Sequence, residues 1–303
     1  DKDDQLVLMG QDIAEYGGVF KVTKDLMSQF GKERVRNTPL CESAIVGIGL
    51  GWSISGKNSV AEMQFGDFVS CAFNQIVNNL AKTHYRWGQN VNVVLRMPTG
   101  AGSGGGPFHS QSTESWFFHT PGLKIVYPSS PYDAKGLLCA AIEDPNPVLF
   151  FEHKGMYRSQ VENVPDEYYT AQLGKAKIVK PGSEISIITY GMGVVWAKDF
   201  QEKNESIDLE IIDLRTLMPW DKELVQLSVE KTGKAIVLTE DTITGAISAE
   251  ISSWIADQLF QYLDAPVKRV GALDTPVPFD KNLEDNFLPI NRFAEVVKEL
   301  ANY

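Results

Sequence analysis

The segment ESAIVGIGLGWSISGKNSVAEMQ, residues 42–64, joins two apolar patterns that together indicate an α/β fold. Its first part, residues 42–54, is long and apolar, as expected for a buried helix. A polar turn follows, and residues 60–64 then form a short segment of strand length. A helix that leads directly into a strand is the repeating unit of α/β proteins.

The same alternation continues on both sides of this segment. The strand-like runs are continuously apolar, which is typical of a mostly parallel sheet covered by helices on both faces. We expect strands at 6–10, 60–64, 91–96, 123–127 and 148–152 and, after a break, at 185–190, 209–214, 235–238 and 267–270. We expect helices at 42–54, 69–87, 113–119, 132–143, 194–203, 222–230, 246–261 and 291–300.

The break in this pattern divides the chain into two α/β domains with mostly parallel sheets. From about Lys154 to Lys180 the sequence has no stable period and is rich in Tyr, Glu, Asn, Pro and Asp. We therefore expect a first domain at 1–160, a linker at 161–180 and a smaller second domain at 181–303.

Composition excludes several classes of function. The 303 residues carry a formal net charge of −11 and no basic stripe, which argues against nucleic-acid or anionic-membrane binding. The three cysteines are far apart and lack CxxC spacing, so we expect a reducing compartment. No apolar run reaches the roughly 18–20 residues of a membrane span, and the abrupt, non-Met start suggests that an upstream segment is missing.

Glu42 is the only charged residue between positions 38 and 51. Burial against the apolar helix would raise its pKa and favour proton donation; alternatively, it is an ordinary first-turn glutamate stabilised by the helix dipole. Gly47, Gly49 and Gly51 do not have the spacing of a dinucleotide fingerprint. We expect them to allow close packing of the helix.

Two further segments carry candidate chemistry. The glycine-rich residues 99–107 follow a strand but lack the Lys-Ser/Thr ending of a phosphate-binding loop, which predicts a mobile active-site or interface loop. His109 comes next, beside hydroxyl and amide groups, and is either an acid/base candidate or a structural histidine. Phe68 follows the expected strand at 60–64 and is either a ligand-stacking ring or an ordinary core aromatic.

Eight sequence blocks resemble the beta subunits of thiamine-diphosphate-dependent 2-oxoacid dehydrogenases, in the transketolase-like group. They occur in family order over nearly the whole chain. The resemblance implies a pyrimidine-binding domain followed by a transketolase C-terminal domain. The blocks are 16–23 (YGGVFKVT), 38–42 (TPLCE), 61–65 (AEMQF), 109–112 (HSQS), 121–126 (PGLKIV), 131–138 (PYDAKGLL), 212–221 (IDLRTLMPWD) and 273–278 (LDTPVP).

The resemblance also implies roles for individual residues. Glu42 matches the glutamate that hydrogen-bonds N1′ of the cofactor's aminopyrimidine ring, and Phe68 matches an aromatic residue that packs on that ring. His109 matches a histidine at the mouth of the channel, associated with acyl transfer to the lipoyl group. Ala141, Asp144 and Asn146 match the helix end that holds a structural K⁺ in branched-chain members.

As partners, the resemblance implies an alpha subunit, or the alpha half of a fused chain, that supplies the diphosphate and Mg²⁺ site. It also implies an α₂β₂ assembly and a dihydrolipoyl acyltransferase core. The expected reaction is oxidative decarboxylation of a 2-oxoacid, branched-chain rather than pyruvate, with reductive acylation of lipoyl groups. Localisation would be a bacterial cytoplasm or a mitochondrial matrix.

Some features depart from the family pattern and leave alternatives open. Most of an N-terminal lead-in segment is absent, which indicates either a trimmed fragment or one half of a fused chain. Thr239-Glu240 replaces a common His-Glu, and Gly245-Ala246 replaces a common Gly-Gly. The alternative functions are two-carbon transfer of the transketolase type and a non-catalytic subunit that retains the fold.

Overall fold

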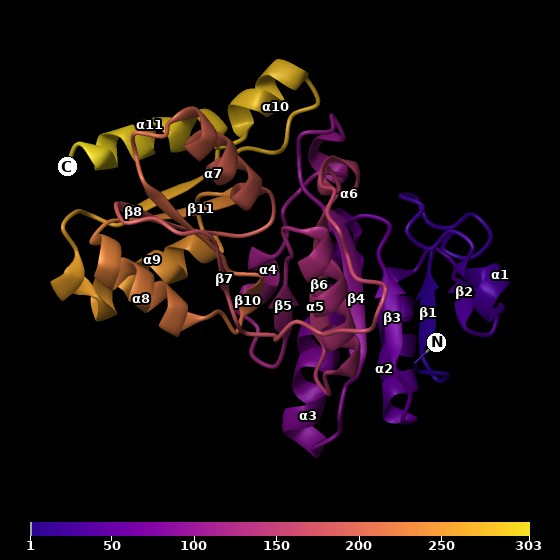
Figure 1. Cartoon of the computed structure of the whole chain (residues 1–303). Helices are drawn as coiled ribbons and strands as arrows, with labels where there is room; N and C mark the ends of the chain where they lie inside the picture. The colour runs from indigo at the N-terminus through magenta and orange to yellow at the C-terminus, as the bar shows by residue number, and fades with distance from the viewer. Residues whose placement is uncertain (1) are drawn as a thin grey trace.

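A computed structural model describes residues 2–303 and contains two sheets that follow one another in the chain (Figure 1). Only the outermost strands β10 and β7 pair antiparallel, so the expected α/β class with mostly parallel sheets is confirmed. The first sheet has the order β10 (Thr216–Met218), β5 (Lys124–Val126), β6 (Val148–His153), β4 (Val93–Thr99), β3 (Ser59–Glu62), β1 (Val7–Gly10), β2 (Val35–Asn37). The second has the order β12 (Lys268–Ala272), β11 (Ala235–Thr242), β8 (Ile185–Thr189), β9 (Leu209–Asp213), β7 (Lys177–Lys180).

Helices cover both faces of each sheet, as the continuously apolar strands predict. On β4, Leu95 packs with one group of helices and Val94 packs with residues of the opposite face. The α-helices are α1 (Leu26–Phe30), α2 (Glu42–Ile54), α3 (Ala81–Trp87), α4 (Ser115–Phe118), α5 (Pro131–Glu143), α6 (Met156–Ser159), α7 (Met192–Lys203), α8 (Lys222–Thr232), α9 (Ile247–Gln258), α10 (Lys281–Phe287) and α11 (Ile290–Ala301). Three segments are 3-10 helices, η1 (Gly66–Ala72), η3 (Gly106–Phe108) and η4 (Phe260–Tyr262), and η2 (Gln75–Leu80) is a π-helix.

Helix α2 begins at Glu42 and buries one face, as its sequence predicts. A Cβ on Gly49 would lie 3.3 Å from Ser59 Oγ and from Val93 Cγ1, so this glycine does allow close packing. Within residues 2–303, a Cβ on Gly51 would have no atom within 4 Å, so close packing inside this chain does not explain that glycine.

Three parts of the fold differ from the expectation. The single helix expected at 69–87 is divided into η1, η2 and α3, and η2 is a π-helix. The linker expected at 161–180 ends in β7, which belongs to the second sheet. Strand β10 lies in the second half of the sequence but pairs with β5 of the first sheet.

The two halves share one apolar core. Phe117 and Tyr127 of the first half belong to the same buried cluster as Tyr190 and Ile247 of the second half. Because interiors pack densely, such a shared core holds the loops of one half against the other. Within residues 2–303, no helix combines the length and apolar composition that a membrane crossing requires.

Candidate active site

Four neighbouring parallel strands bring the candidate residues to one edge of the first sheet. Strands β4, β3, β1 and β2 lie side by side and point in the same direction. His109 comes after β4, Phe68 after β3, Gln11 directly after β1 and Glu42 after β2. In open α/β sheets, ligands bind at this carboxyl edge of the strands. Strands β2 and β4 are the outer strands of this group, three strand spacings or roughly 14 Å apart, so the segments that carry Glu42 and His109 start at its two ends.

Glu42 lies in the first turn of α2 and is half-buried in this chain. Its Oε1 accepts a hydrogen bond of 2.9 Å from Gln11 Nε2. Gln11 itself is buried, and its Oε1 has no hydrogen-bond partner within residues 2–303. A carboxylate and an unpaired amide oxygen therefore lie next to each other. Both accept hydrogen bonds, so the pair would bind a ligand group that donates them.

His109 and Phe68 are brought together, with Phe65 as a third ring. The ring of His109 lies edge-on to Phe65 at 4.8 Å between centroids and to Phe68 at 5.6 Å. Phe65 and Phe68 also meet edge-on at 5.6 Å. These edge-to-face contacts orient the imidazole by packing.

The segment after His109 is anchored by a carboxylate that the sequence pattern alone does not single out. Asp67 is buried, and its Oδ1 accepts from Gln111 N at 3.1 Å and from Gln111 Nε2 at 3.0 Å. Thr99 Oγ1 donates to Gln111 O at 2.6 Å. A signal was present in the sequence, because Asp67 is a charged residue directly beside Phe68 at the end of an apolar strand.

A buried ion-pair network lies in the interior of the sheet beneath this edge. The Arg96 guanidinium on β4 bonds Glu62 on β3 and Glu152 on β6, with a contact of 2.5 Å to Glu62 Oε2 and of 2.6 Å to Glu152 Oε2. Tyr157 Oη also donates to Glu152, at 2.6 Å. Burial raises the pKa of Glu62, and the charge of Arg96 opposes that rise. This network connects three strands and supports the loops above them.

Further titratable groups meet where the two halves pack together. Burial, with the charge of Asp241, raises the pKa of Glu114 to about 8, and Tyr190 Oη donates to Glu114 Oε1 at 2.9 Å. Burial raises the pKa of Asp241 to about 6. His153 Nε2 lies 2.7 Å from Glu240 Oε2. These groups are buried and do not line the Glu42 end of the site.

The residues expected to hold K⁺ lie at the end of α5. The Asp144 carboxylate accepts from Lys124 Nζ and, through Oδ1, from the backbone N and the Nδ2 of Asn146, each at 2.9 Å. Ala141 O accepts from Asp144 N at 3.3 Å. Within the described chain, no cluster of three or more His, Cys, Asp or Glu side chains could hold a metal ion. The K⁺ site stays a prediction.

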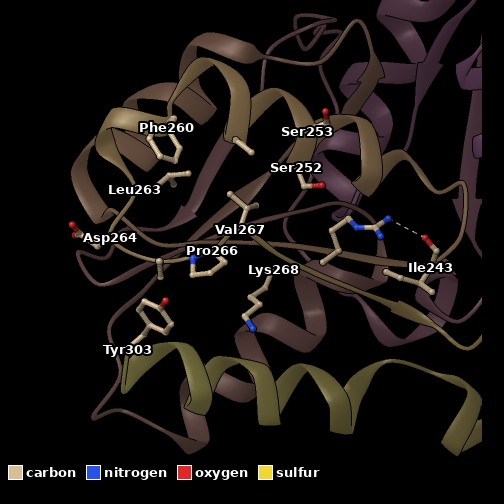
Figure 2. Close-up of a pocket in the computed structure, with 13 residues that line it drawn as sticks. Ile243, Ser252, Ser253, Phe260, Leu263, Asp264, Pro266, Val267, Lys268 and Tyr303 are labelled. Atoms are coloured by element: carbon tan, nitrogen blue, oxygen red, sulfur yellow. Dashed lines mark hydrogen bonds between the residues drawn. The ribbon is translucent and has the colours of Figure 1, made fainter.

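An open cavity of about 850 Å³ lies elsewhere, on the second domain. Figure 2 shows Phe260, Leu263, Val267 and Lys268 along it, with Tyr303 at the chain end beside them. None of the candidate site residues lines this cavity.

Comparisons with known proteins agree with this geometry. Residues 1–160 match the transketolase pyrimidine binding domain, and residues 174–292 match the transketolase C-terminal domain. A split-gene transketolase, solved as an inactive beta4 tetramer, superposes with a TM-score of 0.77 at 21% identity, over 99% of this chain and 93% of that one. The fold and site therefore define a two-domain protein of the transketolase class.

Similar sequences identify the family within this class. The chain is 44% identical to the mitochondrial 2-oxoisovalerate dehydrogenase subunit beta 2 of Arabidopsis thaliana, over 99% of this chain and 85% of the relative. It is 44% identical to 2-oxoisovalerate dehydrogenase subunit beta of Bacillus subtilis, over 100% and 94%. The acetoin:2,6-dichlorophenolindophenol oxidoreductase subunit beta of the same bacterium is 40% identical, over 99% and 92%. The chain belongs to the family of 2-oxoacid dehydrogenase beta subunits.

Proposed function

We propose that this chain is the beta component of a thiamine-diphosphate-dependent 2-oxoacid dehydrogenase that acts on a branched-chain 2-oxoacid and acylates lipoyl groups. The observation that carries the proposal is the convergence of Glu42, Phe68 and His109 on one sheet edge. The 44% identity to 2-oxoisovalerate dehydrogenase beta subunits supports the branched-chain substrate.

The residues present fit an aminopyrimidine ring. Glu42 supplies a carboxylate held by Gln11, and the unpaired Gln11 Oε1 is a second acceptor beside it. Phe68 supplies an aromatic surface on the same edge. When bound, thiamine diphosphate supplies a nucleophilic carbon and an electron sink for decarboxylation. The role of Glu42 is to share a proton with ring atom N1′.

His109 acts at the other end of the site. Its imidazole is oriented by Phe65 and Phe68, and the loop behind it is anchored by Asp67. A neutral or protonated imidazole can donate a hydrogen bond to the substrate and move a proton during acyl transfer. In this proposal Glu42 handles the proton at N1′ and His109 handles the acyl-transfer step.

A partner chain completes the site. Glu42 is half-buried, and the neighbouring Leu40 is 78% exposed, although both belong to an apolar segment. Apolar surface of this kind is typical of subunit interfaces. The partner is an alpha subunit or the alpha part of a fused chain. It would contribute the Mg²⁺ and diphosphate ligands in an α₂β₂ assembly, which in turn acylates a dihydrolipoyl acyltransferase core.

The class of reaction is tested with the chain and its alpha partner, thiamine diphosphate, Mg²⁺ and an artificial electron acceptor. We expect 2-oxoacids to be oxidised faster than sugar phosphates. Faster turnover of sugar phosphates would favour transketolase-type transfer. No turnover despite bound cofactor would favour a non-catalytic subunit. The proposed compartment is a bacterial cytoplasm or a mitochondrial matrix.

A further inference from the structure

The loop between β4 and η3 has the backbone geometry of an anion site. Gly100, Gly102, Gly104 and Gly106 have φ of +97°, +90°, +69° and +65°, a region that favours glycine. Alternation of this conformation turns nearby N–H groups toward one side of the chain, as in the backbone nests that bind phosphate and carboxylate. The alternating glycines thus give the loop a backbone geometry suited to an anion, although it lacks the Lys-Ser/Thr ending of a phosphate-binding loop.

The anion in this site is a side chain of the second domain. Gly102 N donates to Glu284 Oε1 at 2.8 Å, and Gly104 N contacts Oε1 and Oε2 of Glu284 at 3.3 and 3.1 Å. Ala101 N donates to Glu240 Oε1 at 2.6 Å. Glu284 is 2% exposed. A carboxylate so deeply buried requires charge-assisted hydrogen bonds of this kind.

A half-buried lysine lies close enough to be influenced by the charges of the two carboxylates. Lys154 Nζ donates to Gly100 O at 2.6 Å, at the start of the same loop. Burial lowers the pKa of Lys154 to about 8, while the charges of Glu240, Asp67 and Glu284 oppose that shift. The loop is therefore held at Gly100, Ala101, Gly102 and Gly104 by groups from other elements. In Figure 1 it lies beside α10, which carries Glu284.

The anchored loop leads directly to His109. A Cβ on Gly106 would lie 2.3 Å from the ring of Phe279, so the second domain also packs on the start of η3. A Cβ on Gly105 would lie 2.6 Å from Ser110 Oγ and 3.2 Å from His109 Cβ. Because Gly105 lies this close to Ser110 and His109, a displacement of the loop would also displace His109.

We propose that Glu284 is a positioning residue: its carboxylate occupies the backbone anion site of residues 100–106 and thereby holds His109 in place from the second domain. Only the catalytic consequence of this inference rests on the proposed function. The anchoring itself is a property of the chain and can be measured without turnover.

The experiment uses the chain assembled with its alpha partner and compares wild type with Glu284→Ala by amide hydrogen exchange of residues 100–109. We expect exchange to become roughly tenfold faster or more. Excess sodium formate should slow it again by supplying the missing carboxylate, whereas sodium chloride at equal ionic strength should not. Glu284→Gln keeps one acceptor oxygen and the side-chain volume. Its exchange rate should therefore lie between the rates of wild type and Glu284→Ala.

Asp285→Ala is the matched control, because Asp285 is an exposed carboxylate on the same helix that pairs with Lys281. It should leave exchange of residues 100–109 unchanged. Wild-type exchange in Glu284→Ala, or acceleration that formate does not reverse, would overturn the inference.

A second readout separates this inference from the proposed function. Glu284→Ala should slow the same acyl-transfer step as His109→Ala, and formate should restore only the Glu284 variant. If wild type oxidises no 2-oxoacid, the proposed function fails while the exchange result still stands. If wild type is active and formate leaves acyl transfer by Glu284→Ala unrestored, the positioning role is wrong.

Discussion

The two ends of the candidate site are supported in different ways. At one end, Glu42 is half-buried and is held by one hydrogen bond, from Gln11. At the other end, His109 is also half-buried, but its ring packs edge-on against Phe65 and Phe68, and its flanking segments are bonded to Asp67 and Glu284. The difference indicates that the chain builds the His109 end by itself and leaves the Glu42 end to be completed by another surface.

The largest effect is expected at the Glu42 end. Glu42→Gln removes the proton that this carboxylate shares while preserving its shape, so turnover should fall by about two to four orders of magnitude. The thermal midpoint should stay near that of wild type, because Glu42 is only half-buried. Glu33→Gln, at an exposed glutamate paired with Arg36, is the control and should be fully active. Full activity of Glu42→Gln would remove Glu42 from the mechanism.

The next largest effect is expected at the buried ion-pair network of Arg96, Glu62 and Glu152. Arg96→Met leaves Glu62 and Glu152 without their buried cation, which should cost about 3–5 kcal/mol of unfolding free energy. Arg36→Met, at an exposed pair, should cost less than about 1 kcal/mol. Denaturant titration measures both variants. Equal costs would contradict the claim that this network supports the site.

A third prediction tests the interface between the two domains by pH. The pKa of Glu114 is raised to about 8 in the folded chain, against 4.5 as the ordinary value. As the pH rises through this window, the unfolded chain loses a proton that the folded chain retains, so stability falls. Glu114→Gln should remove that loss and gain up to a few kcal/mol on wild type between about pH 5 and about pH 8. Parallel stability profiles of the two proteins would contradict the assignment.

The smallest effect on the chain alone is expected at its exposed apolar surface. Leu40→Ser should change the unfolding free energy by no more than about 0.5 kcal/mol, because Leu40 is 78% exposed. It should nevertheless weaken binding of the alpha partner by roughly tenfold. Leu227→Ser makes the same change at an exposed leucine on α8, away from the site, and is the control. Equal binding by both variants would place the partner elsewhere.

The sequence predicts the parts of the fold that depend on local pattern. Helix α2 lies where the apolar segment predicts it, and its glutamate stands in the first turn. The sequence does not predict strand β2, because its three residues are too few to show a period. Strand β10 pairs with the first sheet although it follows β9 of the second, and such a crossing depends on tertiary packing.

The candidate site also has a part that the sequence predicts and a part that depends on tertiary packing. Glu42, Phe68 and His109 were selected from sequence, but the contact between Phe68 and His109 depends on β3 and β4 being neighbours. Glu284 could not be selected, because it lies in a polar helix and its partner Gly102 is 182 residues away in the chain. Its burial is decided by tertiary contacts alone.

The most direct test of the central claim is the substrate preference of the chain assembled with its alpha partner, thiamine diphosphate and Mg²⁺. Values of kcat/KM are compared for 3-methyl-2-oxobutanoate, pyruvate and acetoin, followed by acylation of a lipoyl domain. The account predicts preference for 3-methyl-2-oxobutanoate and transfer of its acyl group. Preference for pyruvate or acetoin would contradict the branched-chain assignment, and no decarboxylation of any 2-oxoacid would contradict the proposed function.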